Sequence, residues 1–242
     1  MDISQQTAEL SKYMGKLLRD TFGKGPDNVF VSMGGKYITI YVRNLLSPTE
    51  KVLLEKNKQN LFQETRDALL KTILPDIRTS ISLITGMEIK EMYFDWSLQN
   101  KTAVFIGVST DKTASSSPVI QDFPGKAELI KEIDEISAAV QKSPGCIDAF
   151  MLNNRNIIVV RYDILISIER ALIRQGLSRE LRVTKRQLEK NELHNSYFER
   201  ILKTKVDDIF VDWNFELDKS IILFTLRQPF YHISNGQLHS KG

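Results

Sequence analysis

The sequence predicts an α+β protein made of two tandem α-β-β-α-β-β units, each an antiparallel sheet with helices packed on one face, the two related by a pseudo-twofold axis. The first evidence is an internal repeat, since Tyr93-Phe94-Asp95-Trp96 returns as Phe210-Val211-Asp212-Trp213, 117 positions later. The second is that the strand-like run 38–43 matches 156–161 at an offset of 118. Offsets that drift by a residue or two are typical of loop insertions between duplicated units.

Length and composition agree with two units. The chain has 242 residues, which is enough for two domains of about 110–120 residues each. We expect a first unit over residues 1–109, a linker over 110–125, a second unit over 126–230 and a flexible tail over 231–242. The linker is assigned because it is rich in serine, threonine and proline, and the tail because it is polar.

The first unit opens with a helix over residues 3–22, in which apolar residues recur at helical spacing. Gly23-Lys24-Gly25-Pro26 ends this helix, because glycine suits the left-handed position after a helix and proline cannot continue one. Two β-rich runs, 29–33 and 37–43, are joined by Gly34-Gly35-Lys36 and therefore predict a hairpin.

A capped helix follows this hairpin. Ser47-Pro48-Thr49-Glu50 places a serine cap, a first-turn proline and a glutamate at the spacing of a capping box. The helical pattern then runs from 48 to about 85, and we expect Pro75 to break or kink it into a long helix and a shorter one. A second predicted hairpin, over 89–98 and 102–109, completes the unit.

The second unit repeats this order of elements. The expected elements are a helix over 126–142, strands over 146–151 and 156–161, a helical stretch over 165–203, and strands over 206–215 and 220–227. Within the helical regions, Glu50 matches Glu169 at an offset of 119.

Composition and net charge argue against several classes of function. Hydrophobic residues make up 42% and charged residues 26%, as in ordinary globular proteins, and a net charge of +3 is too mild to indicate a nucleic-acid partner. No apolar window is long enough to span a membrane, and the N-terminus lacks the pattern of a signal peptide. Cys146 is the only cysteine, and we expect it to be a small buried residue in a reducing cytoplasm.

The candidate ligand-binding residues all lie in the first unit: Lys24, Arg43, Glu50, Arg66 and Asp95. Lys24 and the backbone N–H groups of its glycine turn could hold an anion such as phosphate, although a helix C-terminus repels anions and needs no ligand. Arg66 has apolar neighbours at helical spacing. We therefore expect it near the buried face, paired with Glu50 or Asp95, or lining an anion pocket.

The repeated Asp-Trp pair has two readings. Strand alternation places Asp95 and Trp96 on opposite faces, so the tryptophan should fill a core or the boundary between units, and Asp95 should accept hydrogen bonds from backbone or arginine. Alternatively, Asp95 and Asp212 could meet across the pseudo-twofold axis as a carboxylate dyad or a cation site.

The helical stretch of the second unit is basic. Residues 168–205 carry ten arginines and lysines against five glutamates. Such a surface could bind nucleic acid or an anionic membrane face. The interleaved glutamates favour a solvated face with i,i+4 ion pairs instead.

No catalytic residue, metal or cofactor is predicted. His194, His232 and His239 have no metal-ligand spacing with one another or with Cys146, and no Ser/His/Asp order or nucleotide fingerprint is visible. We therefore expect a protein that is not an enzyme.

A series of motifs in the first unit resembles the MpsC-like family, bacterial proteins long known only as a domain of unknown function. The motifs are Phe22–Pro26, Leu46–Leu54, Glu64–Arg66, Leu83–Gly86 and Phe94–Trp96.

The second unit looks like a diverged copy of the same domain. Lys142-Ser143-Pro144-Gly145 replaces the glycine turn and Ile166-Ser167-Ile168-Glu169 replaces the helix cap. Lys185 or Arg186 stands where Arg66 is expected.

The resemblance implies an accessory or regulatory role beside a membrane cation-translocating system linked to membrane potential and inorganic-carbon uptake. It implies a cytoplasmic protein, peripheral at the inner face of the membrane, whose partner is a protein such as a membrane transport complex; a homodimer is left open. Two alternatives remain: a small-anion or nucleotide sensor using Lys24, Arg43 or Arg66, and a nucleic-acid-binding protein using the basic helix.

Overall fold

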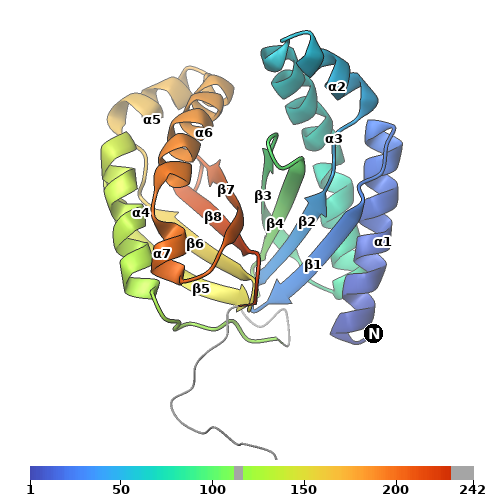
Figure 1. Cartoon of the computed structure of the whole chain (residues 1–242), viewed down its shortest axis with the longest axis horizontal. Helices are drawn as coiled ribbons and strands as arrows, with labels where there is room; N and C mark the ends of the chain where they lie inside the picture. Colours follow the sequence, from blue (N-terminus) through green and yellow to red (C-terminus); the bar gives the residue numbers. More distant parts are fainter. Residues whose placement is uncertain (112–116, 230–242) are drawn as a thin grey trace, which may run out of the picture.

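A computed structural model describes residues 1–111 and 117–229 of the chain, so the tail expected over 231–242 lies outside the described residues. Two units of the predicted element order are present (Figure 1). The first unit consists of α1 (Ile3–Phe22), β1 (Asn28–Gly34), β2 (Tyr37–Arg43), α2 (Pro48–Glu55), α3 (Gln59–Thr85), β3 (Ile89–Ser97) and β4 (Thr102–Ser109). The second consists of α4 (Lys126–Val140), β5 (Cys146–Asn153), β6 (Asn156–Tyr162), α5 (Ser167–Arg174), α6 (Ser178–Asn195), α7 (Phe198–Leu202), β7 (Val206–Asn214) and β8 (Lys219–Leu226).

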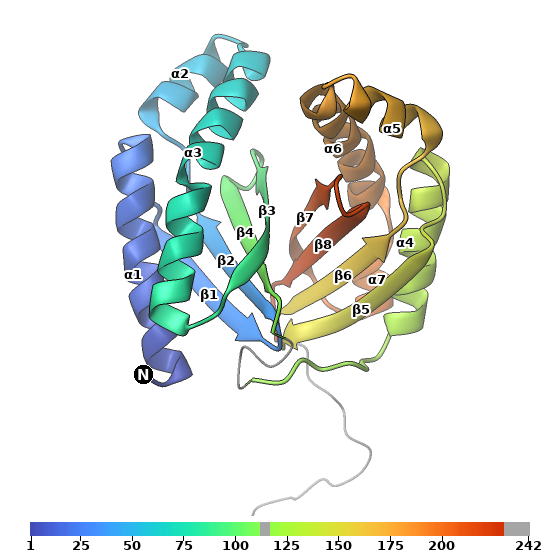
Figure 2. The same cartoon turned by 180° about the vertical axis from the view of Figure 1, so that it is seen from behind.

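Each unit forms one antiparallel four-stranded sheet, with strand order β1-β2-β4-β3 in the first and β5-β6-β8-β7 in the second. The helices cover the outer face of each sheet, and the inner faces of the two sheets meet in the middle of the molecule (Figures 1 and 2). The predicted α+β class and tandem arrangement are therefore confirmed.

The apolar side chains form three clusters that match these layers. One lies between the helices and sheet of the first unit, and a second occupies the same place in the second unit. The third, which we call the seam, lies between the two sheets and contains Tyr37, Tyr41, Tyr93, Val104, Ile106, Val108, Phe150, Leu152, Ile158, Val160, Phe210, Ile221 and Leu223. A continuous buried seam joins the two units into one body.

The helix starts and stops follow the predicted chemistry at most positions. Gly23 caps α1 in the left-handed conformation, with φ of 71°, and Ser47 and Glu50 form the expected capping box at the start of α2. The expected break at Pro75 is wrong, because Pro75 lies inside α3, which runs over 27 residues in all. Pro75 lies on the exposed face, where water can satisfy the carbonyl that proline leaves without a donor.

The helical stretch breaks elsewhere in both units. Asn57 separates α2 from α3 with φ of 56°, and Gly176 separates α5 from α6 with φ of 81°. These residues are 119 positions apart, so the left-handed break is itself part of the repeat. Asparagine and glycine are the residues that adopt this conformation most readily.

Strand pairing corrects one repeat offset. Tyr37 pairs with Val108, and Asn156 pairs with Thr225, so β2 and β6 match at an offset of 119 instead of 118. By this register the counterpart of Arg43 is Tyr162. A shift of one residue moves a side chain to the other face of a sheet.

Cys146 also differs from expectation, since it is exposed at the start of β5 and not buried. The first residue of a strand can lie beyond the area that the helices cover, even when the rest of the strand is buried.

Candidate functional site

Glu50 and Arg66 form a buried ion pair inside the first unit. Arg66 Nε donates to Glu50 Oε1 at 2.6 Å and Nη2 donates to Glu50 Oε2 at 2.8 Å and to the carbonyl of Leu45 at 2.6 Å. The guanidinium also lies 4.9 Å from the ring centre of Phe62 and 5.5 Å from that of Trp96. This bidentate pair ties α3 to the start of α2. Two of the residues predicted to bind a ligand therefore bond to each other.

The second unit contains the same pair in altered form. Lys185 Nζ donates to Glu169 Oε1 at 2.7 Å, and both side chains are buried. Lys185, and not Arg186, is therefore the counterpart of Arg66. Because the pair recurs where the surface has diverged, its role in the first unit is that of a helix anchor.

Asp95 lies at the boundary between the units, where β3 runs beside β7. Its Oδ2 accepts from Val211 N at 2.9 Å, and Asp212 Oδ2 accepts from Phe94 N at the same distance. The two contacts are related by the pseudo-twofold axis, so each aspartate binds the backbone of the other unit. They are not a carboxylate dyad, since each carboxylate bonds to a backbone donor and to basic side chains.

The basic side chains come from α6. Lys190 Nζ lies 2.6 Å from Asp95 Oδ2, Arg186 Nε lies 3.1 Å from Asp95 Oδ1, and Arg182 pairs with Asp212. Burial lowers the pKa of Lys190, and Asp95 opposes that shift. Burial also acts to lower the pKa of Arg186, but Asp95, Asp212 and Asp67 outweigh it and raise the pKa.

The basic helix predicted from the sequence is therefore partly internal. Of its cations, Lys185 and Arg186 are buried, and Arg182 and Lys190 are largely covered at the boundary. Sequence reasoning missed Arg161 and Glu189, which form a buried pair at 2.6 Å on the helix side of the second sheet. The repeat offset of 118 hid the position of Arg161 on the helix side, because it matched Arg161 with Arg43, which lies on the opposite face of its sheet.

The remaining candidates, Lys24 and Arg43, lie near the surface. Lys24 follows the left-handed cap of α1 and is partly exposed. Arg43, at the end of β2, has a side chain 44% exposed and a contact of 3.4 Å with Asp207. The five predicted residues therefore do not meet in one place, and their role in binding a ligand stays a prediction.

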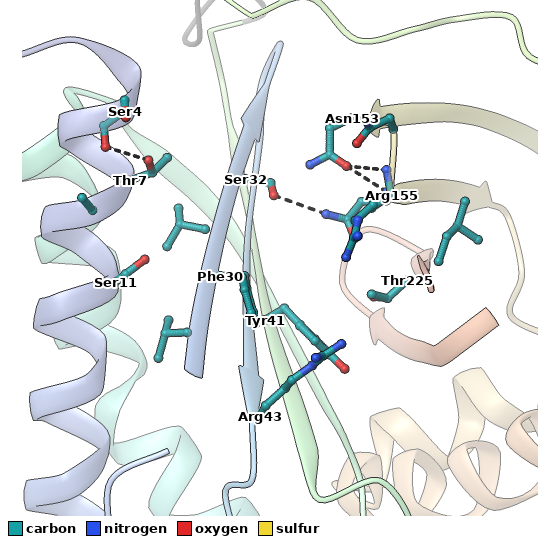
Figure 3. A pocket seen from close by; sticks show the side chains of 16 residues that line it. Ser4, Thr7, Ser11, Phe30, Ser32, Tyr41, Arg43, Asn153, Arg155 and Thr225 are labelled. Carbon is teal, nitrogen blue, oxygen red and sulfur yellow. Dashed lines mark hydrogen bonds between the residues drawn. The ribbon is translucent and has the colours of Figure 1, made fainter. Parts of the chain in front are cut away.

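Arg43 lines a cavity of about 420 Å³ between α1, β1 and the second unit (Figure 3). The wall from the first unit comes from one face of α1, the run Val29–Ser32 of β1, and Tyr41 and Arg43 of β2. The wall from the second unit comes from the β5–β6 turn, Asn153–Asn156, and from Thr225 and Leu226 at the end of β8. The cavity therefore exists only because the two units pack together.

The lining of this cavity mixes apolar, polar and basic side chains and contains no acidic one. Its charged side chains are Arg43 and Arg155, and no aspartate or glutamate is among its sixteen lining residues. Thr225 is 6% exposed, and its Oγ1 has no hydrogen-bond partner among the described residues. A buried hydroxyl without a partner is uncommon in a folded protein and marks a place where a ligand could bond.

Comparison with known families agrees with the two structural units. The family described as "Na+-translocating membrane potential-generating system (MpsC)" matches residues 3–110 and again residues 126–228. The chain belongs to the MpsC family. Both copies of the MpsC domain are complete four-stranded units, and the resemblance of the second copy is confirmed.

No curated protein and no solved structure matches this MpsC chain. In the part of the chain that the structure describes, no helix has the length and apolar character needed to cross a membrane.

Proposed function

We propose that this MpsC protein is a non-enzymatic accessory subunit that docks, in the cytoplasm, on an integral membrane protein of a Na+-translocating, membrane-potential-generating system. Family membership carries this proposal, since the family is described by that system. The role of the chain in it is regulation or assembly through protein contact.

The α2–α3 corner of the first unit is the surface that fits such a partner. It carries Lys51, Lys56 and Lys58, all exposed, with Val52 and Leu61 exposed beside them. No ion pair to these lysines occurs among the described residues. Exposed cations around apolar side chains suit the acidic cytoplasmic loops of a membrane protein or its anionic lipid surroundings.

The alternative of nucleic-acid binding has less support from the structure. Four of the ten cations that made the second-unit helical stretch a candidate are engaged with Asp95, Asp212, Glu169 and Asp67 inside the molecule. Nucleic acid is bound by cations that are free to neutralise phosphates.

The test is affinity purification of the tagged full chain from detergent-solubilised membranes of its native cells, with mass spectrometry of what co-purifies. We expect an integral membrane protein with the natural sequence, and loss of that protein with Lys56→Glu/Lys58→Glu. The control, Lys12→Glu/Lys16→Glu, reverses two exposed lysines on α1 and should retain the partner. Recovery of no membrane protein by the natural chain would reject the proposal.

A further inference from the structure

The pseudo-twofold axis relates the cavity to an equivalent place on the other side of the seam, and the side chains at the two places differ. The strand register makes Ser32 the counterpart of Phe150, and Asn156 the counterpart of Tyr37. On one side, the rings of Tyr37 and Phe150 pack against each other, tilted by 41°, with ring centres 4.8 Å apart. On the other, Asn156 Nδ2 donates to Ser32 Oγ at 3.3 Å. We call these the filled side and the open side.

The substitutions around these pairs follow the same trend. Thr225 on the open side replaces Val108 on the filled side, and Arg43 replaces Tyr162. Small polar or cationic residues therefore occupy the open side where large apolar or aromatic residues close the filled side. A buried hydroxyl without a partner, such as that of Thr225, costs stability, so a ligand that bonds to it would offset that cost.

The linker adds a second difference between the two sides. Ile120 forms a β-bridge with Met151 and so covers the free edge of β5. The equivalent edge of β1 has no strand beside it in the described chain, and four successive β1 residues, Val29 to Ser32, line the cavity. Successive residues point to opposite faces of a sheet, so the cavity must lie along the strand edge, where backbone N–H and C=O groups are available.

The side chains of the open side suit a ligand that carries both a negative charge and a flat ring. Arg43 and Arg155 supply guanidinium groups, which bind phosphate through two parallel hydrogen bonds. Arg43 has a long ion-pair contact with Asp207, and its guanidinium lies 5.5 Å from the ring centre of Phe30 and 5.6 Å from that of Tyr41. The guanidinium of Arg155 has no ion pair among the described residues. Phe30 is 48% exposed at the cavity and offers a ring face for stacking, 6.2 Å from the ring centre of Tyr41.

We propose that the open-side cavity binds a nucleoside monophosphate. Arg43 and Arg155 hold the phosphate, Phe30 packs on the base, and the hydroxyls and amides of Ser32, Asn156 and Thr225 bond to the polar groups of the ligand. The cavity of about 420 Å³ lies within the range of small-ligand sites. The site lies between the units, so binding would stabilise their contact. It does not depend on a membrane partner.

The experiment is calorimetric titration of the full chain with each of the four common nucleoside 5′-monophosphates, the matching nucleosides and inorganic phosphate. We expect saturable binding of at least one nucleotide, with the nucleoside and phosphate at least tenfold weaker. Arg155→Gln should raise the dissociation constant at least tenfold. Arg78→Gln, which removes an exposed arginine of α3 outside the cavity, should leave it unchanged.

A second variant, Ser32→Phe/Asn156→Tyr, copies the aromatic pair of the filled side and should abolish binding by filling the space. If this variant does not fold, Arg155→Gln still decides. The proposal is overturned if no nucleotide binds saturably, if phosphate binds as tightly as the nucleotides, or if Arg155→Gln binds like the natural chain.

Discussion

The open and filled sides of the seam share a fold, a register and a pseudo-twofold axis, yet the filled side has a packed aromatic pair where the open side has a single hydrogen bond. The backbone therefore does not decide whether a cavity forms; the side chains at a few paired positions do. A tandem chain also has one linker, which forms a β-bridge with Met151 of β5 but meets β1 at its last residue, Gly34, beside Val119. Duplication produces symmetry, and the linker together with divergence removes it at the position where a ligand can enter.

The largest expected effect comes from removing the aromatic pair on the filled side. Phe150→Ala should lower the free energy of unfolding by about 3–5 kcal/mol, because a buried ring is lost and a void remains. Its counterpart, Ser32→Ala, should cost about 1 kcal/mol, the value of one weak hydrogen bond. Urea unfolding of both variants measures the difference. Equal costs would mean that the two sides are not packed differently.

A smaller effect separates two of the three seam tyrosines, Tyr37 and Tyr41. The Tyr41 hydroxyl donates to Asp208 Oδ2 at 2.6 Å, whereas no hydrogen bond from the Tyr37 hydroxyl is seen among the described residues. Tyr41→Phe should therefore cost about 1.5–3 kcal/mol, since a buried carboxylate loses a donor. Tyr37→Phe should stay within about 0.5 kcal/mol of the natural chain. A cost for Tyr37→Phe as large as that for Tyr41→Phe would contradict this assignment.

The same two tyrosines should make the free energy of unfolding depend on pH in the alkaline range, by a smaller amount. Burial raises the pKa of both Tyr37 and Tyr41, and the hydrogen bond to Asp208 adds to the shift of Tyr41. Tyrosines of the unfolded chain ionise near pH 10, so above that pH the unfolded state binds fewer protons than the folded state. The free energy of unfolding then falls as pH rises.

Each tyrosine should account for about 1 kcal/mol of this loss between pH 10 and pH 11. Urea unfolding at the two pH values should show a shallower decline in Tyr37→Phe and in Tyr41→Phe than in the natural chain. Parallel declines in all three proteins would show that neither hydroxyl is held protonated by the fold.

Most of the fold could be predicted from the sequence, because repeat motifs, turn glycines and caps act locally. The Gly23 cap and the Ser47–Glu50 capping box are examples, and both appear as predicted. Pro75 could not be judged in this way, since its effect depends on which face of α3 meets water. The break at Asn57 has only a weak local signal, an asparagine between two lysines.

The candidate site was less predictable. Pairing of Arg66 with Glu50 could be expected from helical spacing, but the two-point geometry of the pair depends on tertiary packing. Arg43 was found as a strand-end cation, whereas Arg155 and Thr225 come from the other unit and meet it only through the seam. The sequence match at an offset of 118 instead of 119 also assigned the side chains of β6 to the wrong faces of the sheet, because a shift of one residue exchanges the two faces.

The most direct test of the asymmetry is thiol reactivity at a matched pair of positions. In a Cys146→Ser background, which removes the exposed natural thiol, Thr225→Cys and Val108→Cys place nearly isosteric thiols at counterpart positions of β8 and β4. A negatively charged methanethiosulfonate reagent should modify the thiol at 225 at least tenfold faster than the thiol at 108. The two arginines should also make the negative reagent faster at 225 than a positive one. Equal rates at the two positions would contradict the open and filled sides on which this account depends.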